Sequence, residues 1–205
     1  RLKAARGPEL KTIHIAGRKY VGMGVTGKAE RSGAIDENAR RGGPDNRTGV
    51  NTTERALPLI EKYAGGPFFF FVHYKEVDVT AHLSSVDSTA YREVLIQIDR
   101  ELGVLLAALE ANHAMPQTSV VVTSDHGFPG RFHVSRDQTN LETFIAALNL
   151  ELDGERTAKL LDVTPTILDY FGVATENLNP SLEGRSLLPR PGGPTTTTTS
   201  STAVS

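Results

Sequence analysis

Short runs of apolar or alternating residues predict the β-strands of this chain. Lys11–Ala16 alternates polar with apolar residues and contains β-branched side chains, which favours a strand. Phe68–His73 and Ser119–Thr123 are continuous apolar runs, so we expect strands that are buried on both faces. Thr143–Ala147 is a further predicted strand.

Apolar residues at helical spacing fill the segments between these strands. Thr52–Tyr63 begins with threonine and is followed by Gly65-Gly-Pro67, which predicts a short helix. A long amphipathic helix is expected from Asp87 or Ser88 to about Ala111, and Leu160–Gly172 predicts a last helix that glycine ends. The expected inward positions of the long helix are Val94, Ile98, Leu102, Leu105 and Leu109. Alternating strands and helices predict an α/β layered domain with a mostly parallel sheet.

Two stretches lack this periodicity. Residues 17–50 are rich in Gly, Arg and Asn, which is typical of a functional loop, an insertion or a disordered segment. Residues 191–205 are mostly Thr and Ser and are expected to be a disordered tail after a partial domain at 1–190. Leu2–Arg6 has the pattern of a helix end, so we expect the domain to lack its N-terminal part.

Composition narrows the function classes. The 205 residues can bury a core, and a net charge of -2 argues against a general nucleic-acid binder. The chain has no cysteine, which excludes thiolate ligands, and no apolar stretch reaches the roughly 20 residues of a membrane span. We interpret the basic pairs Arg18-Lys19 and Arg40-Arg41 as solvated surface, although they could face an anionic substrate.

Carboxylates and imidazoles follow two of the predicted strands. Asp78 and His82 come after the phenylalanine-rich run and are four residues apart, so one helical turn would place them on the same face. Asp125 and His126 follow the valine-rich run directly, and His133 lies in the next loop. Because the carboxyl ends of parallel strands meet at one edge of a sheet, these side chains could form a site there. Oxygen and nitrogen ligands of this kind suit zinc or a similar divalent ion. The alternative is a strand-end turn with surface histidines.

Other polar residues need no function. His14 lies inside a predicted strand and is expected to be packed, and His73 is expected to pack at a strand end or to support the site from behind. Lys75 and Glu76 are expected to face water.

The order Asp-x-x-x-His, Ser-Asp-His-Gly and a further His resembles the alkaline phosphatase superfamily, in particular its type I phosphodiesterase/nucleotide pyrophosphatase branch. Three flanking stretches are similar to that superfamily: the helix segment from Ile98, Leu161–Val173 and Leu182–Leu188. The resemblance covers roughly residues 50–190 and implies an alkaline phosphatase-like fold.

The resemblance also implies roles for the candidate ligands. Asp78, His82 and His133 would hold one divalent ion, and Asp125 with His126 would hold a second. Zinc is the expected metal, with manganese or calcium as alternatives. The superfamily's Ser or Thr nucleophile and a further Asp are expected upstream of residue 1, so this segment alone is expected to be inactive.

The implied activity is hydrolysis of a small phosphorylated substrate, a nucleotide being one candidate, in an extracytoplasmic or secreted setting. A sulfatase-type hydrolase with one calcium is an alternative, because the stretches from Gly65 and from Gly184 also look similar to sulfatases. A third alternative is an inactive homologue that only binds metal or a partner.

Overall fold

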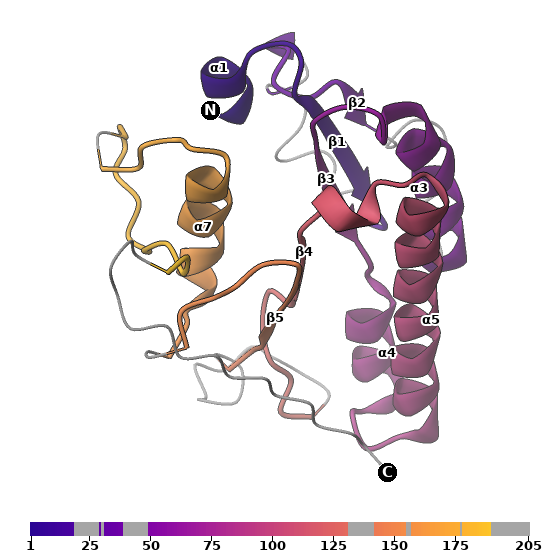
Figure 1. Cartoon of the computed structure of the whole chain (residues 1–205). Helices are drawn as coiled ribbons and strands as arrows, with labels where there is room; N and C mark the ends of the chain where they lie inside the picture. The colour runs from indigo at the N-terminus through magenta and orange to yellow at the C-terminus, as the bar shows by residue number, and fades with distance from the viewer. Residues whose placement is uncertain are drawn as a thin grey trace. The chain divides into compact units, whose positions relative to one another are not determined.

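The computed structural model describes residues 1–18, 29, 31–38, 49–130, 142–154, 157–176 and 178–189. The chain divides into two compact units (Figure 1). The first contains Arg1–Thr118 and His126–Thr143, and the second contains Ser119–Asp125 and Phe144–Ser205. The predicted tail at 191–205 lies outside the described residues.

A parallel sheet organises the first unit. Its strands are β1 (Lys11–Ala16), β2 (Glu37–Asn38) and β3 (Phe68–His73), in the order β2-β1-β3. β1 pairs in parallel with both neighbours, and Ala16 at its end lies opposite His73 of β3. The carboxyl ends of β1 and β3 therefore lie side by side, as the α/β prediction requires.

The expectation that the phenylalanine-rich run is buried on both faces is wrong for this sheet. β1 is the central strand, and Ile13 and Ile15 are each 1% exposed. β3 pairs with β1, and its Phe71 remains 41% exposed. Pairing order decides which strand is buried, and an apolar run does not report its position in a sheet.

Four helices of the described part of the first unit accompany this sheet. They are α1 (Leu2–Arg6), α3 (Gly49–Tyr63), α4 (Glu76–Ser84) and α5 (Thr89–Ala111), followed by the 3₁₀ turn η1 (Met115–Gln117). α3 packs on β1 and β3, and α5 packs against α3 and α4. α5 confirms the predicted long helix, with the Ser88 hydroxyl as its N-cap accepting from the Tyr91 amide. The predicted inward positions are buried or half-buried.

α3 begins three residues before the predicted start at Thr52. Thr52 and Thr53 are 1% and 2% exposed, so they lie inside the packed interface of the helix. In the sequence, a threonine at the start of a periodic segment resembles an N-cap. The burial of Thr52 and Thr53 shows instead that both lie within the helix.

A polar cluster anchors the segment before β2. The Asp36 carboxylate accepts hydrogen bonds from Lys3 Nζ at 2.8 Å, from the Thr12 amide at 2.8 Å and from the Thr12 hydroxyl at 2.9 Å. Burial raises the pKa of Asp36, but these hydrogen bonds from Lys3 and Thr12 outweigh it and lower the pKa below its ordinary value. The ionised carboxylate therefore links α1, β1 and β2.

The second unit contains an antiparallel pair and a helix. β4 (Val120–Thr123) pairs with β5 (Ile145–Leu148), and η2 (Leu160–Asp162) leads into α7 (Val163–Tyr170). Both predicted strands exist, but β4 is half-buried along its length, so its expected burial on both faces is wrong. The fold as a whole is mixed α/β, as predicted, with parallel pairing in the described part of the first unit only.

Asp162 ties the C-terminal stretch of this unit together. The residue is 2% exposed, and its carboxylate accepts from the amides of Lys159 and Arg185, each at 2.8 Å. The Thr166 hydroxyl donates to the Asp162 carbonyl and accepts from the Leu187 amide. These contacts join the two stretches, Leu161–Val173 and Leu182–Leu188, that resemble the superfamily's C-terminal region.

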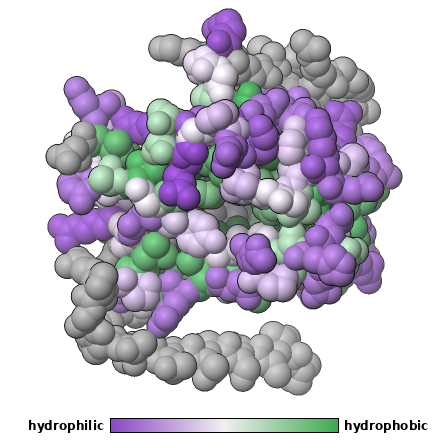
Figure 2. Space-filling model, turned by 45° about the horizontal axis from the view of Figure 1, so that its top comes forward, coloured by the Kyte–Doolittle hydropathy of each residue, from purple (hydrophilic) through white to green (hydrophobic). Residues whose placement is uncertain are grey.

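Several apolar side chains reach the surface, and Figure 2 shows them as green areas among hydrophilic residues. Leu83 is 70% exposed and Ile96 is 52% exposed. Within the described residues, none of the helices combines the length and the apolar character that crossing a bilayer requires.

Candidate functional site

Asp78 and His82 lie one turn apart on α4, which begins three residues after β3 ends. His82 Nε2 is 3.4 Å from Asp78 Oδ1. The expected helical turn is therefore present, and it directs both side chains to the same place. The side chains of His82 and Asp78 are 31% and 20% exposed, and both carboxylate oxygens of Asp78 are buried.

His126 approaches the same carboxylate from the loop after β4. Its Nε2 is 3.8 Å from Asp78 Oδ1, and its Nδ1 is 2.8 Å from the Gly127 carbonyl oxygen. A carbonyl can only accept, so His126 Nδ1 donates this hydrogen bond and carries a proton, while Nε2 is directed toward Asp78. A backbone carbonyl commonly orients a metal-binding histidine in this way.

Phe128 contacts both imidazoles. Its ring is 4.9 Å from the His82 ring in an edge-to-face arrangement at 78°, and 5.8 Å from the His126 ring. This aromatic wall restricts the rotation of both rings. Sequence reasoning missed Phe128, and the available signal was an aromatic residue two positions after His126.

Arg18 reaches Asp78 from the end of β1. Its Nη1 is 3.0 Å from Asp78 Oδ2, and its side chain is 41% exposed. The Arg18 side chain is exposed at the surface, as expected, and its guanidinium in addition pairs with a predicted metal ligand. The other members of the basic pairs, Lys19, Arg40 and Arg41, lie outside the described residues.

The structure does not test the two remaining predicted ligands. Asp125 is exposed and belongs to the second unit, and His133 lies outside the described residues. Among the residues that the structure does describe, no three His, Asp or Glu side chains are grouped as a metal site. The five-ligand set thus stays a prediction.

The chemistry of the described donors nevertheless fits a divalent cation. Two imidazole nitrogens, of His82 and His126, face one carboxylate oxygen of Asp78. At 3.8 Å, the His126 nitrogen is too far for a direct hydrogen bond to that oxygen. One carboxylate oxygen with two imidazole nitrogens is a donor set that zinc accepts.

Buried polar groups lie next to this site in sequence. Glu76 was expected to face water, but its Oε1 is buried, and its Oε2 accepts from the Lys75 amide at 3.0 Å. Burial raises the pKa of Glu76 and also that of Tyr74, whose hydroxyl lies 2.9 Å from the Thr53 hydroxyl. The Tyr74 hydroxyl thus links the residues before α4 to α3, and one carboxylate oxygen of Glu76 is buried rather than solvated.

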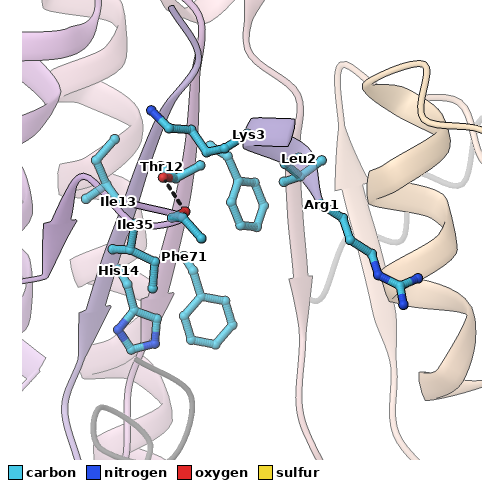
Figure 3. A pocket seen from close by; sticks show the side chains of 10 residues that line it. Arg1, Leu2, Lys3, Thr12, Ile13, His14, Ile35 and Phe71 are labelled. Atoms are coloured by element: carbon cyan, nitrogen blue, oxygen red, sulfur yellow. Dashed lines mark hydrogen bonds between the residues drawn. The ribbon is translucent and has the colours of Figure 1, made fainter. Parts of the chain in front are cut away.

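His14 is packed, as predicted, since it is 7% exposed and its ring stacks on Phe71 at 5.1 Å. Both residues line a cavity of about 360 Å³ on the face of the sheet near α1 (Figure 3). The Thr12 hydroxyl in its wall shares its single proton between the Ala34 carbonyl and the Asp36 carboxylate. None of the predicted ligands in the described part of the chain lines this cavity, which separates it from the candidate site.

Comparison with known proteins supports the same kind of chemistry as the candidate site. The sequence model described as type I phosphodiesterase / nucleotide pyrophosphatase matches residues 28–181 of the 205. The chain is 33% identical over 75 residues to human ectonucleotide pyrophosphatase/phosphodiesterase family member 7. It is 29% identical over 145 residues to the 2,3-bisphosphoglycerate-independent phosphoglycerate mutase of Paracoccus denitrificans.

These alignments cover only part of each relative. The match to the human protein spans 37% of this chain and 14% of the relative, and the match to the mutase spans 67% and 27%. The family model, in contrast, spans well over half of this chain and includes Asp78, His82, Asp125, His126 and His133.

Proposed function

Because the chain belongs to the type I phosphodiesterase/nucleotide pyrophosphatase family, we propose that it acts as a metal-dependent hydrolase of phosphoric esters, of the phosphodiesterase or phosphatase type. The observation that carries this proposal is the arrangement of His82 and His126, whose Nε2 atoms both face Oδ1 of Asp78. One carboxylate oxygen and two imidazole nitrogens are ligands that a divalent cation such as zinc prefers.

In this proposal Asp78, His82 and His133 hold one ion, and Asp125 with His126 hold a second. When bound, zinc-like ions supply charge stabilisation for a phosphoryl group and its leaving oxygen. The chain's own residues orient these positions: the Gly127 carbonyl sets the tautomer of His126, and α4 sets the spacing of Asp78 and His82.

The substrate would be a small phosphorylated molecule. One relative is named for nucleotide pyrophosphatase and phosphodiesterase activity and the other for a phosphoglycerate, so both names concern phosphoric esters. The prefix in the name of the human ectonucleotide enzyme supports an extracytoplasmic setting for this chain as well.

Metal binding tests this function. We expect chelator-treated protein to bind about two zinc ions per chain in calorimetric titration, as a two-metal site requires. Asp78→Ala should lower zinc affinity at least about tenfold, since it removes the carboxylate that both imidazoles face. Asp99→Ala, at an exposed position of α5, is the matched control and should bind zinc like the unmodified protein.

The other possible results of these experiments distinguish the alternatives. One calcium and no zinc would replace this proposal with the sulfatase-type alternative. Absence of metal binding would overturn it. Hydrolysis of bis(p-nitrophenyl) phosphate that survives both Asp78→Ala and Asp125→Ala would overturn the assignment of the site. Metal binding without hydrolysis by the full-length protein would support the inactive homologue.

A further inference from the structure

We draw no further inference here: the strongest candidate, the cavity of about 360 Å³ on the face of the β2-β1-β3 sheet near α1, is lined mainly by apolar side chains, and nothing in the described part of the structure shows what fills it.

Discussion

The centroid of the Phe128 ring lies 4.9 Å from the centroid of the His82 ring, and the two rings meet edge to face. The same phenylalanine also contacts His126, so one apolar side chain supports two of the predicted metal ligands. Neither histidine can turn freely while this ring is present.

Phe128→Ala should therefore weaken zinc binding about tenfold, because both imidazoles lose the wall that orients them. Phe128→Tyr keeps the ring and should retain most of the affinity. Leu83→Ala, next to His82 but 70% exposed, is the control for a lost apolar side chain. Equal zinc affinities of Phe128→Ala and the unmodified protein in calorimetric titration would show that the contact does not orient the ligands.

Asp36 should make stability depend on pH in the acid range. Its pKa in the folded protein is lower than the ordinary value of 3.8, so its contribution is present above about pH 4 and is lost as the pH falls through the folded-state pKa. Asp36→Asn should be less stable than the unmodified protein at neutral pH, and the difference should narrow below about pH 4. Urea unfolding at several pH values measures this, with exposed Asp99→Asn as control. A difference that is constant with pH would contradict the assignment.

Asp162→Ala should destabilise the second unit. The substitution removes the carboxylate that accepts from the amides of Lys159 and Arg185, and a hydrogen bond to a charged group contributes about 1.5–3 kcal/mol. Asp169→Ala, at an exposed position of the following helix α7, should change the free energy of unfolding by less than about 0.5 kcal/mol. Similar urea midpoints for the two variants would show that the Asp162 contacts do not stabilise the fold.

Gly184→Ala should also destabilise this unit, for a steric reason. A Cβ atom at position 184 would collide with the carbonyl group of Leu161, which is backbone and cannot turn away. We expect a loss of about 1–3 kcal/mol, as in other overpacked sites. Gly154→Ala is the matched control, since a Cβ atom there has no neighbour within 4 Å. Equal melting temperatures of the two variants would contradict this packing.

The long helix and the Asp78–His82 pair were predictable because they depend on local sequence. A period of 3.6 residues with a serine cap defines α5, and a spacing of four places two side chains on one helical face. The alternating run Lys11–Ala16 likewise predicts a strand, whatever its neighbours are.

Local patterns misjudged the burial of the strands. The apolar run Phe68–His73 looks more deeply buried than Lys11–Ala16, yet the latter is the central strand. Strand order depends on which backbones pair, and that choice involves residues far apart in the chain.

By itself, the sequence determined the helices, the strands, the family and the types of side chain available for a site. Only the tertiary structure decided that Arg18, His126 and Phe128 lie around Asp78 and His82. The physical reason is that parallel pairing of β1 with β3 brings the end of one strand to the start of α4. Sequence spacing carries no information about such a contact, because its energy appears only when the distant segments pack together.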